Sequence, residues 1–197
     1  MAITHLSQLD LNQSYTYADY LTWQVKERLE LLLGHVRLIS PAPNRAHQRI
    51  SGNLFLILGQ HFKQSPCKLF AAPFDVRLPR PGETHPSAVK TVVQPDLCVV
   101  CDPAKLDERG CNRAPELVVE ILSPGNTRFE LREKYRLYES SGVKEYWVVS
   151  QSDLSVSRYV LSDSGQYVSA PPLTDLDMIE TPLFPGLKVD LAEVFAE

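Results

Sequence analysis

Two carboxylates lie in apolar surroundings where a charge is costly to bury. Glu120 interrupts the apolar run at residues 117–122, and Asp96 begins a second apolar run. An ionised carboxylate in such a strand needs a counter-charge, a hydrogen-bond donor or a metal ion. Two acids on adjacent strands can share one hard cation, because Mg²⁺ binds one or two carboxylates together with water and phosphate oxygens. Asp96 and Glu120 are therefore predicted metal ligands.

The alternative for Glu120 is a structural ion pair with a basic residue of a packed helix. Glu120 lies three residues before Ser123, about 10 Å back along its strand at ~3.3 Å per residue. Lys134 lies seven residues past Thr127, also about 10 Å at ~1.5 Å per residue along a helix. If the helix folds back over the strand, the two side chains meet, and Lys134 can stabilise charge on a phosphate or orient a water. The other reading is a surface lysine paired with Glu130.

These residues must be positioned by a mixed set of helices and strands. Apolar residues at helical spacing predict a long helix over 43–62, and a helix over 127–141 ends at Gly142. The remaining helices are expected at residues 16–23 and 190–195. Strands are expected at residues 29–33, 36–40, 68–78, 92–101, 116–122, 143–150, 155–160 and 166–169. This order predicts an α/β (α+β) fold with a mixed central sheet flanked by helices. We expect one domain over residues 1–197, with residues 1–14 as a loose N-terminal segment.

Composition limits the classes of function. The chain has 197 residues, 44% of them hydrophobic, and no apolar run approaches the ~20 residues of a membrane span. The N-terminus has neither the basic start nor the apolar core of a secretory signal, so we expect a cytoplasmic protein without a membrane partner. A net charge of −4 argues against a chain that coats nucleic acid, but not against an enzyme acting on it.

The cysteines do not predict a zinc site. Cys98 and Cys101 form a CxxC, but residues three apart on a strand face opposite sides of the sheet. We expect these two, together with Cys67 and Cys111, to be reduced and mostly buried thiols.

Several motifs together resemble one known family. They are Glu30 in the run 29–34, Ser40-Pro41-Ala42-Pro43, His47, residues 72–78, Gln94-Pro95-Asp96, residues 114–124, Lys134 with Tyr138, and residues 142–149. In combination they are similar to the Uma-two family of restriction endonucleases, within the PD-(D/E)XK nuclease superfamily. The resemblance covers nearly the whole chain, from about residue 17 to residue 195.

The resemblance implies a restriction-endonuclease-like fold with extra N-terminal and C-terminal hairpins. It also implies a Mg²⁺ or Mn²⁺ site at Asp96 and Glu120. The superfamily's lysine, two residues after the glutamate, is replaced here by Leu122, and its role passes to Lys134 on the following helix. Glu30 would be an additional N-terminal acid near the metal, although a hairpin glutamate is more often simply solvated. Lys134 and Glu30 complete the expected catalytic set with Asp96 and Glu120.

Other residues suggest contacts with partners. Arg128, Arg132 and Arg136 repeat at i, i+4 and i+8, which fits either a solvated helix face or contact with nucleic-acid phosphates. His47 fits either a water-positioning base or a packing and capping residue. We expect a homodimer, by analogy with enzymes that cut two strands, with the apolar strand around Tyr146 or an edge hairpin as the contact.

The leading hypothesis is a Mg²⁺- or Mn²⁺-dependent endonuclease that hydrolyses phosphodiesters, with DNA as the expected substrate. One alternative is a non-catalytic nucleic-acid-binding or protein-interaction module on the same fold. A second is a glycosidase with two carboxylates, which is disfavoured because no tryptophans cluster near the two acids.

Overall fold

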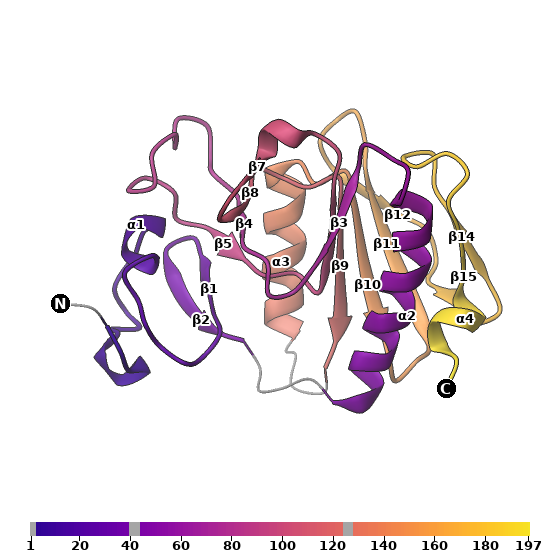
Figure 1. The fold of residues 1–197 in the computed structure, drawn as a ribbon, viewed down its shortest axis with the longest axis horizontal. Helices are drawn as coiled ribbons and strands as arrows, with labels where there is room; N and C mark the ends of the chain where they lie inside the picture. The colour runs from indigo at the N-terminus through magenta and orange to yellow at the C-terminus, as the bar shows by residue number, and fades with distance from the viewer. Residues whose placement is uncertain (1–2, 40–43, 124–127) are drawn as a thin grey trace.

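The computed structural model describes residues 3–39, 44–123 and 128–197 (Figure 1). Its helices are η1 (Leu6–Gln8), α1 (Tyr17–Tyr20), α2 (Arg45–Phe62), η2 (Pro103–Lys105), α3 (Arg128–Ser141) and α4 (Leu191–Phe195). Its strands are β1 (Leu29–Leu32), β2 (His35–Leu38), β3 (Lys68–Ala71), β4 (Val76–Arg77), β5 (Val92–Val93), β6 (Leu97–Val100), β7 (Leu106–Asp107), β8 (Gly110–Asn112), β9 (Leu117–Leu122), β10 (Glu145–Ser150), β11 (Ser155–Leu161), β12 (Tyr167–Ser169), β13 (Leu173–Thr174), β14 (Met178–Glu180) and β15 (Lys188–Asp190).

The described strands form three sheets. The first sheet has the order β2-β1-β5-β4-β8-β7, and the second has the order β12-β11-β10-β9-β6-β3 with β13 beside β11. A separate hairpin pairs β14 with β15. The mixed α+β architecture agrees with the sequence prediction. The first sheet was not foreseen as a unit, because several of its strands have only two or three residues and carry little periodicity.

The second sheet lies between two helices (Figure 1). β9 and β10 are parallel, and α3 is the crossover that joins them. On the α3 face, Val118 and Tyr146 of the sheet pack with Tyr138 of the helix. On the opposite face, Val119 and Trp147 pack in one apolar cluster with the buried side of α2. Because side chains alternate along β9, Glu120 shares the α3 face with Val118.

The predicted strand at residues 92–101 is wrong in one respect: it is two strands in two sheets. β5 belongs to the first sheet and β6 to the second. Pro95 lies at the break, where it has no backbone N–H to give to a ladder and restricts Gln94 before it. The backbone N–H of Gln94 instead donates to the side chain of Glu30, at 2.8 Å. The break brings Asp96 to the junction of the two sheets.

The expected N-terminal hairpin forms, with its turn one residue earlier than the predicted strands at 29–33 and 36–40 imply. β1 pairs antiparallel with β2 through a turn at Leu33 and Gly34, whose φ angles are 54° and 90°. Both angles positive is the pattern of the tight hairpin turn. A Cβ on Gly34 would lie 2.3 Å from the hydroxyl of Ser14 and 3.2 Å from the backbone carbonyl of Tyr15, so a larger side chain here would force these neighbours to move.

The expectation of four reduced cysteines is wrong for two of them. Cys67 and Cys101 form a disulfide, while Cys98 and Cys111 are free and buried. The physical reason is strand register: Lys68 pairs with Val100 across β3 and β6, so the residues just outside that pair also lie opposite each other. Cys98 and Cys101 do pack on opposite faces of the sheet, as the strand geometry predicted.

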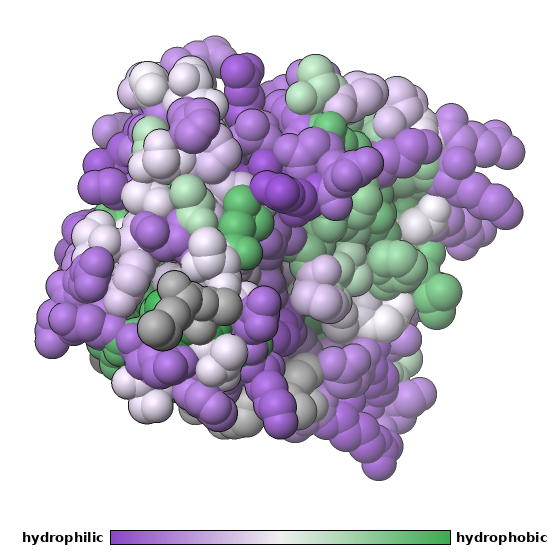
Figure 2. Space-filling view, turned by 60° about the vertical axis from the view of Figure 1, so that its left-hand side comes forward, coloured by the Kyte–Doolittle hydropathy of each residue, from purple (hydrophilic) through white to green (hydrophobic). Residues whose placement is uncertain are grey.

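The strand around Tyr146 does not form a contact surface, contrary to expectation. β10 lies between β9 and β11, and Tyr146 and Trp147 are buried. Exposed apolar side chains remain on the β11–β12 hairpin at Val160 and Val168. Figure 2 shows a mostly hydrophilic face, with hydrophobic residues gathered to the right of a central furrow. No helix of the described residues is both long and apolar enough to cross a membrane.

Candidate active site

The two predicted metal ligands lie side by side on neighbouring strands. Leu97 pairs with Val119 across β6 and β9, and continuing this antiparallel register by one residue sets Asp96 opposite Glu120. Asp96 is held in place through one oxygen, Oδ2, which accepts the backbone N–H of Ile121 at 2.7 Å. The side chain of Asp96 is 21% exposed and that of Glu120 is 13% exposed. The pair is therefore near the surface without being fully solvated.

The lysine on α3 reaches the sheet at the level of Glu120. Nζ of Lys134 donates to Oε1 of Glu120 at 2.8 Å, and the hydroxyl of Tyr138 donates to the same oxygen at 2.6 Å. Of the described residues, none donates to Oε2 of Glu120. One oxygen of Glu120 is thus fixed by the helix, and the other is left for a ligand.

Glu30, on β1 of the first sheet, also contacts Lys134. Its Oε1 accepts the ammonium of Lys134 at 3.2 Å and the backbone N–H of Gln94 at 2.8 Å. Glu30 is only 5% exposed, so the reading of it as an ordinary solvated hairpin residue does not fit. Lys134 therefore ties β1 to β9 through two carboxylates.

The charges of this group perturb one another. Burial raises the pKa of Glu120 to about 7, and although Lys134 opposes this shift, the charges of Asp96 and Glu30 add to it. Burial acts to lower the pKa of Lys134, but the two glutamates beside it raise the pKa on balance, so the ammonium stays charged. Burial and the nearby Glu120 carboxylate raise the pKa of Tyr138, which stays a hydrogen-bond donor.

His47 approaches the site from α2. Asn44 caps this helix by accepting the backbone N–H of His47 at 2.8 Å, and Nε2 of His47 lies 3.3 Å from Oδ1 of Asp96. His47 is 6% exposed, and among the described residues its Nδ1 has no hydrogen-bond partner. With Ile121 on the other oxygen, both oxygens of Asp96 have a neighbour that fixes the carboxylate plane.

The donor set fits a hard divalent cation. Glu30 and Glu120 share the single ammonium of Lys134, and the charge of Asp96 acts on Glu120, which leaves negative charge for a cation to balance. Among the described residues, no three His, Cys, Asp or Glu side chains are placed to hold a metal ion. Mg²⁺ needs fewer, since it keeps several waters and takes one or two carboxylates. Asp96 and Glu120 are the residues that would hold it.

Arg128, Arg132 and Arg136 form the predicted arginine stripe on α3, and the structure describes the side chains of the last two. Arg132 and Arg136 are exposed on α3, and neither has an ion-pair partner among the described residues. Arg128 begins the helix, but its side chain lies outside the described residues. Contact of this stripe with nucleic acid stays a prediction.

Sequence reasoning gave no role to two residues that contact this group. Tyr138 follows Lys134 at i+4, so it lies on the same face of α3, and this spacing was the available signal. Gln94 holds Glu30 through its backbone and Asp75 through its side-chain amide, at 2.8 Å each. Its role depends on the break between β5 and β6, for which the sequence offered only Pro95.

Comparison with known proteins identifies the family of this chain. The Uma2 family model, described as "Putative restriction endonuclease", matches residues 17–192. The chain belongs to the Uma2 family. This confirms the family resemblance seen in the sequence, because the match spans every element that contributes to the site.

Two other proteins are similar to this Uma2 chain. It is 24% identical over 153 residues to the uncharacterized protein slr1290 of Synechocystis sp., a match that covers 76% of each chain. Its structure is similar to the crystal structure of a protein of Anabaena variabilis described as a "putative nuclease belonging to DUF820". That match has a TM-score of 0.71 and 16% identity, and covers 92% of this chain and 97% of the other. The predicted nuclease-like α+β fold is thereby confirmed for this Uma2 chain.

Proposed function

We propose that this protein is a divalent-metal-dependent endonuclease that hydrolyses phosphodiester bonds of DNA. The observation that carries the proposal is the arrangement around Glu120. One of its oxygens is held by Lys134 and Tyr138, and the carboxylate of Asp96 lies across from it on the next strand. An ion pair that served stability alone would not require Asp96 and Glu30 beside it, because each added carboxylate raises the cost of burial.

Each residue has a distinct role in this proposal. Asp96 and Glu120 would hold Mg²⁺ or Mn²⁺, which supplies a Lewis acid and a more acidic attacking water when bound. Lys134 keeps its charge, so its ammonium can donate to a phosphate oxygen as negative charge builds up there. Glu30 accepts a hydrogen bond from Lys134 and so fixes the direction of the ammonium.

Nucleic acid is the proposed substrate because the family is described as a restriction endonuclease. We also propose a homodimer, since a symmetric pair presents two sites to the two strands of a duplex. The exposed apolar residues Val160 and Val168 of the β11–β12 hairpin are available for such a contact.

Nicking of supercoiled plasmid in Mg²⁺ or Mn²⁺ tests the proposal. Asp96→Asn and Glu120→Gln should each lower the rate at least about a hundredfold, because each removes a charge from the metal site. Glu108→Gln changes an exposed glutamate in the turn between β7 and β8, outside the contacts of Asp96, Glu120 and Lys134, and should leave the rate unchanged. Melting temperatures verify that all variants fold. Undiminished cleavage by both site variants would overturn the assignment.

A non-catalytic module on the same fold is the competing function, and Leu122 at the usual lysine position favours it. Calorimetry with Mn²⁺ separates the two. The nuclease should bind the ion with a heat that Glu120→Gln abolishes. A protein that binds DNA but gives no heat at about 1 mM Mn²⁺, the weak end of protein affinities for divalent ions, would be such a module.

A further inference from the structure

A small pocket of about 290 Å³ includes Asp96 in its lining. The first half of α2 forms one part of its wall, and Arg28, with Ala71 and Ala72 at the end of β3, forms the rest. His47 lines it beside Asp96. A group bound in this pocket would therefore lie next to a proposed metal ligand.

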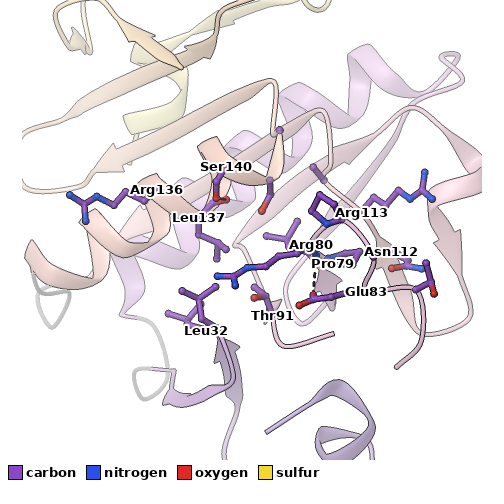
Figure 3. Close-up of a pocket in the computed structure, with 18 of the residues that line it drawn as sticks. Leu32, Pro79, Arg80, Glu83, Thr91, Asn112, Arg113, Arg136, Leu137 and Ser140 are labelled. Carbon is purple, nitrogen blue, oxygen red and sulfur yellow. Dashed lines mark hydrogen bonds between the residues drawn. The ribbon is translucent and has the colours of Figure 1, made fainter. Parts of the chain in front are cut away.

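A larger pocket of about 930 Å³ lies between the loop at residues 79–84 and α3 (Figure 3). Its charges are mixed, because Glu83 and Glu133 line it together with arginines. Arg113 and Arg136 stand at opposite ends of it, with their side chains directed away (Figure 3). None of the three carboxylates of the candidate active site is among its described lining residues. The smaller pocket is thus the one that extends the active site.

The smaller pocket has an exposed aromatic ring. Phe55 is 41% exposed and lies on α2 eight residues after His47, about 12 Å along the helix at ~1.5 Å per residue. Other residues form the buried side of α2, so core packing does not explain a phenylalanine at this position. An exposed ring beside a phosphodiester site offers a flat face on which a nucleic-acid base can stack.

Gly52 keeps the wall of the pocket open. It lies in the middle of α2, where every residue except proline is more favourable than glycine. A Cβ at this position would meet no atom within 4 Å, so close packing does not require glycine. A side chain would instead occupy open space that borders the pocket. The glycine therefore leaves room for a ligand against the helix.

Arg28 brings a positive charge to the same pocket. Its Nε and Nη2 donate to Oε1 of Gln94 at 3.0 and 2.9 Å, which holds the guanidinium plane. Among the described residues, no carboxylate forms an ion pair with it. Its charge and its Nη1 donors are left for an anion such as a phosphate. The side chains of Gln48 and Ser51, also in the lining, make no hydrogen bond to any described residue.

We propose that this pocket binds one unpaired nucleotide of a DNA strand, next to the phosphodiester that the active site would cleave. The base stacks on Phe55, Gly52 gives it room against α2, and Arg28 binds a phosphate of the strand. Stacking on a side chain requires a base that has left its pair, which costs least in single-stranded DNA. This inference rests on the proposed endonuclease function and assigns its substrate class.

Binding measured in EDTA tests the pocket apart from cleavage. Fluorescence anisotropy follows a labelled oligothymidylate of about twelve nucleotides, within the range of single-strand sites, and a labelled duplex of the same length is the comparison. Phe55→Ala removes the ring, and Gly52→Leu fills the space beside it. Leu56→Ala and Gln60→Leu are the matched controls, because both residues are exposed on α2 and neither lines the pocket.

Phe55→Ala and Gly52→Leu should each weaken single-strand binding at least about fivefold, the lower end of the effect of one stacked base. Phe55→Trp should keep the affinity, because it keeps an aromatic face, and both controls should keep it as well. Duplex binding should change much less in Phe55→Ala. Gly52→Leu should melt no lower than wild type, since leucine favours a helix more than glycine does.

The salt dependence of binding tests the phosphate contact. In Arg28→Gln the slope of log affinity against log salt for the single strand should become shallower by about 0.7, the value for one phosphate contact. Lys26→Gln is the control, because Lys26 is exposed on the same segment and does not line the pocket. It should leave the slope unchanged. An equal change in both variants would remove Arg28 from the pocket's function.

Three results would overturn the inference. They are unchanged single-strand affinity in Phe55→Ala, losses as large in the controls or on the duplex, and no single-strand binding by wild type at about 100 µM protein, the weak end of non-specific affinities. The endonuclease proposal fails separately. If the Phe55 and Gly52 losses occur in a protein that does not nick plasmid, only the nuclease assignment is wrong. If plasmid is nicked but these variants bind like wild type, only the pocket assignment is wrong.

Discussion

The ammonium nitrogen of Lys134 lies 2.8 Å from Oε1 of Glu120, which is 14 residues earlier in the chain. The distance reflects a helix that returns over the strand before it, so that the middle of α3 faces the end of β9. Glu30 shares the same ammonium at 3.2 Å. One lysine thus compensates two glutamates from two different sheets.

Removal of the lysine charge should lower the stability of the metal-free protein. In Lys134→Met two buried carboxylates lose their partner, and we expect a loss of about 3–5 kcal/mol in the free energy of unfolding without metal. Mn²⁺ should restore part of it, because the ion supplies the missing positive charge. Urea unfolding with and without Mn²⁺ measures both effects. Lys144→Met, at an exposed position, should change neither. Full stability of the metal-free Lys134 variant would contradict the buried ion pair.

Metal affinity should depend on pH through Glu120. Because its pKa is raised to about 7, the carboxyl is partly protonated at neutral pH and must lose that proton to bind a cation. Mn²⁺ affinity should therefore rise roughly tenfold per pH unit below pH 7 and level off above it. Calorimetry in buffers of different ionisation enthalpy should detect the released proton at about pH 6. If the Mn²⁺ affinity did not change between pH 5.5 and pH 8, deprotonation of Glu120 would not be coupled to metal binding.

The raised pKa of Glu120 also makes the free energy of unfolding of the metal-free protein depend on pH. The folded-state pKa lies above the unfolded value of 4.5, so the contribution of this carboxyl is fully present below pH 4.5 and is lost as the pH rises through about 7. Glu120→Gln does not titrate and should lack this decline. Urea unfolding at several pH values compares the two proteins. Identical pH profiles would exclude Glu120 as the group responsible.

Tyr138 should tune this titration. Tyr138→Phe removes the donor 2.6 Å from Oε1 of Glu120 and should cost about 1–2 kcal/mol of stability. Loss of a hydrogen bond to the charged carboxylate should raise the pKa of Glu120 further, so the midpoint of Mn²⁺ binding moves to higher pH. Tyr167→Phe is the matched control, since that buried hydroxyl donates to the carbonyl of Val143 instead. The Tyr167→Phe protein should lose a similar amount of stability, and the pH midpoint of its Mn²⁺ binding should not change.

His47 should act by orienting Asp96. In His47→Leu the carboxylate loses the neighbour 3.3 Å from Oδ1, and we expect Mn²⁺ to bind about 10–100-fold more weakly. His47→Gln keeps a donor of similar reach and should recover most of the affinity. His61→Leu, at the other end of α2, provides the control. Equal Mn²⁺ affinity in wild type and His47→Leu would remove His47 from the site.

The sequence by itself determined the local part of this arrangement. The apolar run around Glu120 identifies a buried strand with one acid in it, and Gly142 ends the helix that follows. Strand and helix rise per residue then predict that Lys134 reaches Glu120, and their side chains do meet. These inferences succeed because they depend only on spacing within one continuous segment.

Only the tertiary structure decided which distant residues join that segment. Glu30 and Lys134 are 104 residues apart, and their contact depends on how the two sheets meet at α3. The division of residues 92–101 between two sheets and the pairing of Cys67 with Cys101 likewise follow from strand register. Register is set by pairing across the whole sheet and by burial of one face, so no short stretch of sequence contains it.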